Sequence, residues 1–309
     1  MTILLVLLGF SISPADSARA LVSIRSIPEA AVYYSQMAAA EDGEHMVEFA
    51  HILEASGRFS EAYRVYGLAL GNSSSQSTSR WLINRRLGVS PLDTTLVITA
   101  SVTNTGDAAA WNVQVIIPMP VSHPPFQTLT ILSNDFTPSG GLLSARIPII
   151  APGQTVRLSV TVSITQQPGS MRPVTGQISD EALAWITHTL RSMNIPEALP
   201  GPCIPMSEEM ARLAAGEIGL SMTVEGGLIL DTGGCIFHAW DVINEYNIRI
   251  DPLLFKDDSL LSIAHNPADV VPLWDLSTTD GYELNLLFKD PACSLTGTMS
   301  ATAIQALEE

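Results

Sequence analysis

Five segments between Thr95 and Thr165 place apolar residues at alternate positions and are rich in β-branched side chains. The turn-forming sequences NTGD, PSGG and APGQ lie between them. A period of two, interrupted at short intervals by turn signals, is typical of antiparallel strands that bury one face. The sequence therefore predicts an antiparallel β-sandwich over residues 91–172, with strands at 95–103, 112–118, 127–132, 142–149 and 155–165.

A helical pattern precedes the predicted sandwich. Met46, Phe49 and Leu53 recur at helical spacing, and a second run of this kind follows Gly57, which stands where a helix C-cap belongs. This predicts a helical hairpin, and the stretch GNSSSQSTS at 71–79 has the composition of a polar linker. We assign residues 21–90 to the hairpin and this linker.

Helices and short strands follow the predicted sandwich in residues 173–309. The stretch from Ser179 to Met193 is helical in pattern, with Ser179 as a candidate N-cap, and helical spacing returns from Met206 to Gly216. Strand-like pieces then occupy 220–224, 228–230, 236–243 and 248–251. The predicted fold class of this region, and of the chain, is α+β.

Charge and the first twenty residues bear on location and partners. Acidic residues outnumber basic residues 31 to 15, which disfavours binding to nucleic acid or to an anionic membrane surface. Residues 3–10 are an apolar run, and Ala18-Arg19-Ala20 resembles a signal-peptidase site. We predict a signal peptide over 1–20 and a secreted or cell-envelope protein. A buried helix is the alternative, because no Lys or Arg precedes the run, and no segment is long enough to span a bilayer.

Cys203 lies immediately before the second predicted helix, in PGPCIPMSEEM. The first N–H groups of a helix lack partners within the helix, and the helix dipole stabilises an anion there. A thiolate is such an anion, and its pKa falls further beside an imidazolium. Cys203 is therefore a candidate nucleophile, and a buried structural thiol is the alternative.

His238 and Asp251 are predicted to meet across a strand hairpin. If Asn244-Glu245 centres an even-length loop, His238 lies directly opposite Asp251 on the same face of the sheet. A carboxylate in that position orients the imidazole and stabilises its charged form. The expected constellation is a Cys203, His238 and Asp251 triad.

The residues that carry this chemistry resemble those of the transglutaminase-like superfamily, whose core is that of papain-type cysteine enzymes. The matching pieces are a helix, then GPC opening a second helix, then strands, then HAW at 238–240, then a strand ending IDP at 250–252. The resemblance implies that Cys203 is the nucleophile, His238 its base and Asp251 the residue that orients His238. Upstream, VTNTGDAAAWNVQVIIPMP resembles immunoglobulin-like adhesion modules of exported microbial proteins, which implies a spacer or docking role.

The function that the resemblance implies is acyl transfer at an amide of a protein or peptide substrate, either as a peptidase or amidase or as a protein cross-linking enzyme. No cofactor and no metal is predicted, and the oligomeric state is left open. The alternative is a catalytically inactive member of the superfamily that serves as a cell-envelope binding or structural module. Reactivity of the Cys203 thiol distinguishes the two.

Three further patterns remain. LILDTGG at 228–234 resembles an aspartic-protease loop, but a single copy supplies one aspartate, Asp231, where two must share a site. Cys235 and His238 have the spacing of half a zinc site, without a second pair to complete it. If the protein is exported and Cys203 stays free, Cys235 and Cys293 are the remaining disulfide pair, and two separate thiols are the alternative.

Overall fold

The computed structural model divides the chain into two compact units, Met1–Ser90 and Pro91–Glu309, and combines α-helices with antiparallel sheets. Among the residues that the structure describes, no helix is both long and apolar enough to cross a membrane. The structure describes residues 21, 29–30, 32–34, 43–55, 57–73, 75–124, 127–168, 178–194, 202–231, 234–246, 248–257, 263, 268–276, 285–287 and 294–304. The predicted signal peptide lies outside these residues.

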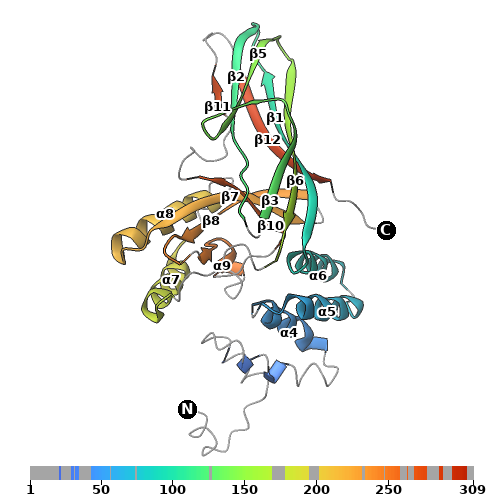
Figure 1. The fold of residues 1–309 in the computed structure, drawn as a ribbon, viewed down its shortest axis with the longest axis vertical. Coiled ribbons are helices and arrows are strands. Elements are labelled where there is room, and N and C mark those ends of the chain that lie inside the picture. Colours follow the sequence, from blue (N-terminus) through green and yellow to red (C-terminus); the bar gives the residue numbers. More distant parts are fainter. Residues whose placement is uncertain are drawn as a thin grey trace, which may run out of the picture. The chain divides into compact units, whose positions relative to one another are not determined.

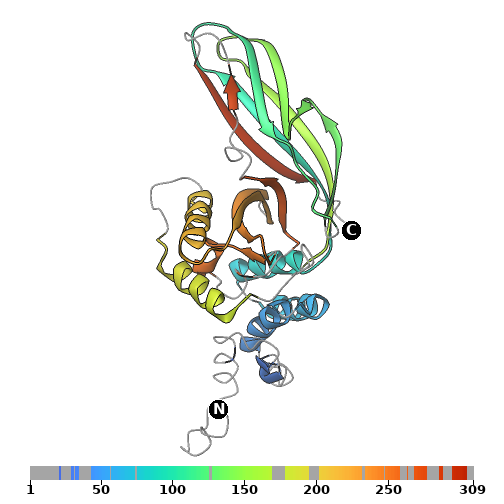
Figure 2. The same cartoon turned by 60° about the vertical axis from the view of Figure 1, so that its left-hand side comes forward.

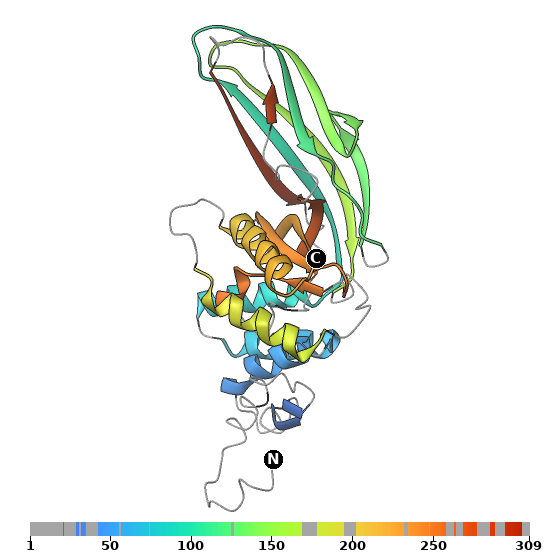
Figure 3. The ribbon, with the colours of Figure 1, turned by 90° about the vertical axis from the view of Figure 1, so that its left-hand side faces the viewer.

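The first unit contains the helices α4 (Gly43–Ala55), α5 (Phe59–Gly71) and α6 (Gln76–Gly88), with α4 packed on α5 and α5 on α6 (Figure 3). The buried Glu54 carboxylate of α4 joins all three, because it accepts a hydrogen bond of 2.6 Å from Tyr66 of α5 and pairs with Arg85 of α6. The helices α4 and α5 correspond to the predicted hairpin.

The Ser-rich stretch at 71–79 is not a linker throughout. Helix α6 begins within it, and the Ser75 side chain accepts a hydrogen bond from the backbone N–H of Thr78, at 3.5 Å, as an N-cap. Serine is common both in linkers and at N-caps, so its composition favoured the wrong assignment here.

Two four-stranded antiparallel sheets form a long sandwich in the second unit (Figure 1). The five predicted strands are present, and a short additional strand, β4, lies between the third and fourth. The sheets have the orders β12-β1-β6-β3 and β11-β2-β5-β4. Their bounds are β1 (Leu92–Asn104), β2 (Ala110–Pro118), β3 (Gln127–Asn134), β4 (Thr137–Ser139), β5 (Leu142–Ile150), β6 (Thr155–Gln166), β11 (Asn285–Leu287) and β12 (Leu295–Ile304).

The sandwich extends beyond its predicted boundary at residue 172, because β11 and β12 come from the C-terminal part of the chain. Strand β12 runs antiparallel along β1, from Thr95 opposite Ile304 to Asn104 opposite Leu295. Without β12 the long edge of β1 has no partner on that side. A sandwich of residues 91–172 alone therefore lacks an edge strand of each sheet.

This placement of β12 predicts unequal effects of two neighbouring substitutions. Met299 is partly buried against the sandwich core, whereas Thr298 is exposed. Met299→Asp buries a carboxylate among apolar groups and is expected to lower the free energy of unfolding by about 2 kcal/mol. Thr298→Asp is expected to change it by less than about 0.5 kcal/mol. Urea unfolding of both full-length variants measures the difference, and equal effects would mean that β12 is not seated in the sheet.

The third sheet has the order β10-β7-β8-β9, and Figure 2 shows the helices α7 and α8 beside it. The predicted N-cap is confirmed, since the Ser179 hydroxyl accepts from the N–H of Ala182 at 3.1 Å. The pieces predicted at 220–224 and 228–230 are one continuous strand, β7. The bounds are α7 (Asp180–Ser192), α8 (Cys203–Glu217), β7 (Met222–Asp231), β8 (Gly234–Ile243), β9 (Ile248–Ile250), α9 (Leu254–Asp257) and β10 (Val270–Asp275).

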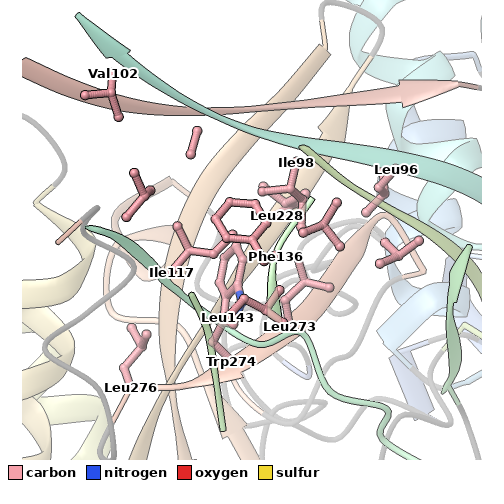
Figure 4. Close-up of a cluster of buried hydrophobic side chains, with 14 of the residues drawn as sticks. Leu96, Ile98, Val102, Ile117, Phe136, Leu143, Leu228, Leu273, Trp274 and Leu276 are labelled. Carbon is pink, nitrogen blue, oxygen red and sulfur yellow. The ribbon is translucent and has the colours of Figure 1, made fainter. Parts of the chain in front are cut away.

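The sandwich and the third sheet share one apolar core. Figure 4 shows Ile98 of β1 and Phe136 beside Leu228 of β7 and Leu273 of β10. Buried glutamines add polar connections across the same boundary. The side chain of Gln127 donates to the Pro272 carbonyl at 2.9 Å, and that of Gln166 donates to the Val270 carbonyl at 2.8 Å. The third sheet is thereby fixed against the end of the sandwich.

Candidate active site

Cys203 is the first residue of α8 and is 3% exposed. The first hydrogen bond of the helix runs from the N–H of Met206 to the carbonyl of Pro202, at 3.1 Å, so the N–H groups of Cys203 and Ile204 precede it. Pro205, which has no N–H, lies in this first turn, where proline is tolerated. The Cys203 thiol is therefore held at the positive end of a helix dipole.

His238 on β8 and Asp251 after β9 form a buried pair. The ring Nε2 of His238 lies 2.8 Å from Oδ2 of Asp251, and the two residues are 6% and 1% exposed. Because Nε2 faces Asp251, Nδ1 is the ring nitrogen left for Cys203, whose side chain is near enough to His238 to raise the pKa of the ring. The structure thus brings the three predicted site residues together.

The pairing of β8 with β9 differs from the prediction by two residues. Asp241 lies opposite Ile250, which centres the hairpin loop one residue later than Asn244-Glu245. By this register Asp251 lies diagonal to His238 and not directly opposite. Shifting the centre of the loop by one residue moves the pairing by two, so both side chains keep the same face of the sheet. The diagonal arrangement still brings the two side chains into contact, since His238 Nε2 lies 2.8 Å from Asp251 Oδ2.

Electrostatics favour the charged form of both members of this pair. Burial acts to lower the pKa of His238, but the charge and hydrogen bond of Asp251, followed by those of Cys203, raise it to about 9. Burial acts to raise the pKa of Asp251, but His238, Arg249 and the N–H of Leu254 lower it below its usual value. At neutral pH the site accordingly holds an imidazolium beside a carboxylate, a state in which a neighbouring thiolate is stabilised.

Arg249 was not identified from the sequence. It is 2% exposed, its Nη2 donates to Oδ2 of Asp251 at 2.7 Å, and its guanidinium carbon lies 4.7 Å from the ring centre of Trp240. The indole N–H of Trp240 donates in turn to Glu225 at 3.1 Å. The one sequence signal was a charged residue two positions before Asp251, on the same face of a strand that is otherwise apolar.

Asp241 is a second buried carboxyl near the pair. It is fully buried, and its pKa is raised well above the usual value by burial first and by the charge of Asp251 second, while Ser207 acts to lower it. Burial thus disfavours the charged form of Asp241.

Gly227 on β7 lies opposite His238, and a side chain there has no room. A Cβ would overlap the carbonyl oxygen of Val271 and lie 2.8 Å from Cη2 of Trp240. Gly227→Ala is therefore expected to lower the free energy of unfolding by at least about 2 kcal/mol, because backbone has to move. Gly216→Ala, near the end of α8, is the matched control, since a Cβ added there would meet nothing within 4 Å and alanine favours helix. Thermal unfolding of both variants tests this, and a neutral Gly227→Ala would contradict the close packing of β7 and β10.

The competing patterns gain no support from the geometry. Cys235 and His238 are three positions apart on one strand, so alternation points them to opposite faces. Within the described ranges no group of three or more His, Cys, Asp or Glu is arranged to hold a metal ion. Asp231 is the last residue of β7 and is paired with Gly234, the first residue of β8. Cys293 lies outside the described residues, so its predicted disulfide with Cys235 stays a prediction.

A cavity of about 340 Å³ opens between α7 and α8 beside the turn that begins with Cys203. Its walls are formed by the C-terminal end of α7 and the residues after it on one side, and by α8, including its first turn and Glu209, on the other. A larger cavity, of about 590 Å³, lies in the helical unit and includes none of the three site residues. The smaller cavity is lined by Thr189, Ser192, Met193, Asn194, Pro205, Met206, Glu209 and Leu213.

Comparisons with known proteins give one structural likeness. No protein-family model matches the chain, and no curated protein matches it. Among solved structures, the chain is similar to one described as a "Putative Cysteine Protease from Cytophaga hutchinsonii", with 11% identity and a TM-score of 0.34. The match covers 70% of this chain and 92% of that one.

Proposed function

We propose that this protein is a cysteine-dependent acyl transferase of the transglutaminase-like superfamily that acts on amides of proteins or peptides. The observation that carries the proposal is a buried cysteine at a helix N-terminus beside a histidine whose ring Nε2 lies 2.8 Å from a buried carboxylate. In this arrangement each group has one role. Cys203 is the nucleophile, His238 transfers the proton, and Asp251 orients His238.

The first half of the reaction forms a thioester. The Cys203 thiolate attacks the amide carbonyl carbon, and the N–H of Cys203 at the start of α8 is suited to stabilise the oxyanion that forms. The imidazolium of His238 donates its proton to the leaving nitrogen as the carbon–nitrogen bond breaks. The products of this half are a free amine and an acyl group on sulfur, with His238 neutral.

The second half regenerates the thiolate. Neutral His238 removes a proton from water or from an amine, which attacks the thioester carbonyl and displaces the Cys203 sulfur. Water gives a carboxylic acid, so the enzyme is a peptidase or amidase. An amine gives a new amide, so the enzyme is a cross-linking transferase. The cavity between α7 and α8 is suited to hold a substrate side chain next to the reacting amide.

Export belongs to the same proposal. The apolar run at residues 3–10 followed by Ala18-Arg19-Ala20 supports a cleaved signal, and the acidic composition suits a partner that is neither nucleic acid nor an anionic membrane. The substrate would then be a protein or peptide outside the cytoplasm. N-terminal sequencing of the secreted protein tests the cleavage, and a mature chain that retains residues 1–20 would refute it.

Trapping the acyl-enzyme tests the reaction itself. The protein is incubated with p-nitrophenyl acetate and digested, and the modified peptide is identified by mass spectrometry. The expected result is an acetyl group on Cys203 that is removed by hydroxylamine. Release of the acetyl group with and without an alkyl amine, together with fluorescent casein as a protein substrate, distinguishes hydrolysis from transfer. Absence of acetyl-Cys203 from the folded protein would refute the proposal.

A further inference from the structure

The site contains a buried cation that the proposed triad does not use. Arg249 is 2% exposed. Burial is the largest influence on its pKa and lowers it, whereas the charges of Asp251 and Asp269 act to raise it. Taking a guanidinium out of water is costly unless it is paired and hydrogen-bonded. A cation kept at that cost beside a catalytic carboxylate calls for a role.

The hydrogen bonds of Asp251 show how that cation is used. Oδ2 of Asp251 accepts from both Arg249, at 2.7 Å, and the ring of His238, at 2.8 Å. Oδ1 accepts from the backbone N–H of Leu254 at 3.0 Å. The carboxylate is thus fixed from two directions by groups other than His238, and the oxygen that His238 uses is shared with a permanent positive charge.

The guanidinium itself is held in place by stacking. Its carbon lies 4.7 Å from the centre of the Trp240 ring, and Trp240 is fully buried and fixed by its hydrogen bond to Glu225. Trp240 stands two residues after His238 on β8, so both rings lie on the same face of the strand, 6.1 Å apart. One strand therefore carries the base and also the platform that aligns the cation next to the carboxylate.

The catalytic cycle gives this arrangement its purpose, provided that the proposed function holds. His238 is charged in the resting enzyme and neutral once it has protonated the leaving nitrogen. In that second state His238 no longer balances the buried negative charge of Asp251. Without Arg249, the triad would then contain no cation to stabilise the carboxylate. We infer that Arg249 is a positioning residue that keeps Asp251 ionised and in place while His238 is neutral, so that the proton leaves His238 for the substrate.

Other charged groups face this cluster from the surrounding elements. Asp269, just before β10, acts on Arg249, and Asp241 of β8 lies near Asp251, where burial raises its pKa. Cys203 of α8 acts on His238. Among these groups Arg249 is the one whose positive charge does not change during the cycle. If Arg249 were removed, only the imidazolium of His238 would balance the negative charge of Asp251. His238 would then hold its proton more tightly.

The test is a titration of His238 by NMR with histidine labelled at the ring carbon Cε1, assigned with His238→Gln. It is carried out in full-length protein with Cys203→Ser, which removes the thiolate, and then with Arg249→Met added. Arg249→Met is expected to raise the pKa of His238 by at least about 0.5 unit. Arg249→Lys keeps the charge and is expected to change it by less than about 0.3 unit. Arg212→Met, which breaks an exposed ion pair on α8, is the matched control and should leave it unchanged.

The outcomes separate this inference from the proposed function. An unchanged or lowered pKa of His238 in Arg249→Met, with a native circular dichroism spectrum, would overturn the role of Arg249. If Arg249→Met does not fold, a shift of more than about 0.5 unit in Arg249→Lys would overturn it instead, because charge would not be what matters. Failure of the proposed function has a different signature. In that case the pKa of His238 would be the same with and without the Cys203→Ser substitution in otherwise unaltered protein.

Discussion

Cys203→Ser is expected to reduce the rate of p-nitrophenol release from p-nitrophenyl acetate by at least about 10³-fold. The start of α8 and the imidazolium of His238 stabilise a thiolate, because a thiol titrates only slightly above neutral pH. A serine hydroxyl is far less acidic, so the same surroundings do not ionise it. Stopped-flow or steady-state absorbance measures the release.

Cys235→Ser is the matched control for that experiment. Cys235 lies on the same strand as His238, three residues away, and on the opposite face. The variant is expected to keep the full rate. A Cys203→Ser protein that retains activity while Cys235→Ser loses it would assign the nucleophile to Cys235 and contradict the site described above.

Asp251→Asn is expected to lower the same rate by about 10²- to 10⁴-fold and to destabilise the fold by about 3 kcal/mol. The rate falls because asparagine neither stabilises the imidazolium nor fixes its orientation by charge. The fold is weakened because Arg249, a buried cation, loses the carboxylate with which it forms an ion pair of 2.7 Å. Urea unfolding and ester hydrolysis measure the two effects separately.

The stability cost of Asp251→Asn should depend on pH with a definite sign. The pKa of His238 is raised to about 9 in the folded protein, above the ordinary value of 6.5. Protonated His238 therefore contributes its full stabilisation of the fold below about pH 6.5, and this contribution is lost as the pH rises through about 9. Asp251, whose pKa is lowered, stabilises the fold above its ordinary value of 3.8 and loses this as the pH falls further. The cost should therefore be greatest near pH 5 to 6.5. Asp107→Asn, in an exposed bend, should show no such dependence.

The strands of the sandwich could be predicted because each is marked locally. Strand β1 alternates between buried and more exposed residues along most of its length, and Gly140, Gly141 and Gly153 adopt positive φ in turns that PSGG and APGQ indicated. The pairing of β12 with β1 could not be predicted, because it joins segments about 200 residues apart and local alternation does not name a distant partner.

The candidate site divides in the same way. The local sequence pattern predicted Cys203 at the start of a helix and His238 and Asp251 on either side of a hairpin. The predicted register was wrong by two residues, but an even shift keeps His238 and Asp251 on the same face of the sheet. Arg249 was missed because a charged residue in a strand is usually exposed. Its burial depends on Trp240 and Asp251 meeting in three dimensions, which no single segment of the sequence displays.

The most direct test of the central claim is the rate at which iodoacetamide modifies Cys203 as a function of pH, in the unsubstituted protein and in His238→Ala. A thiolate paired with the imidazolium of His238 predicts rapid modification well below about pH 8.5, the region in which a free thiol ionises, and a clear slowing at the same pH in His238→Ala. Modification is followed by mass spectrometry of the Cys203 peptide. Equal rates in the two proteins, rising only near the pH at which a free thiol ionises, would contradict the thiolate–imidazolium pair on which the proposed chemistry depends.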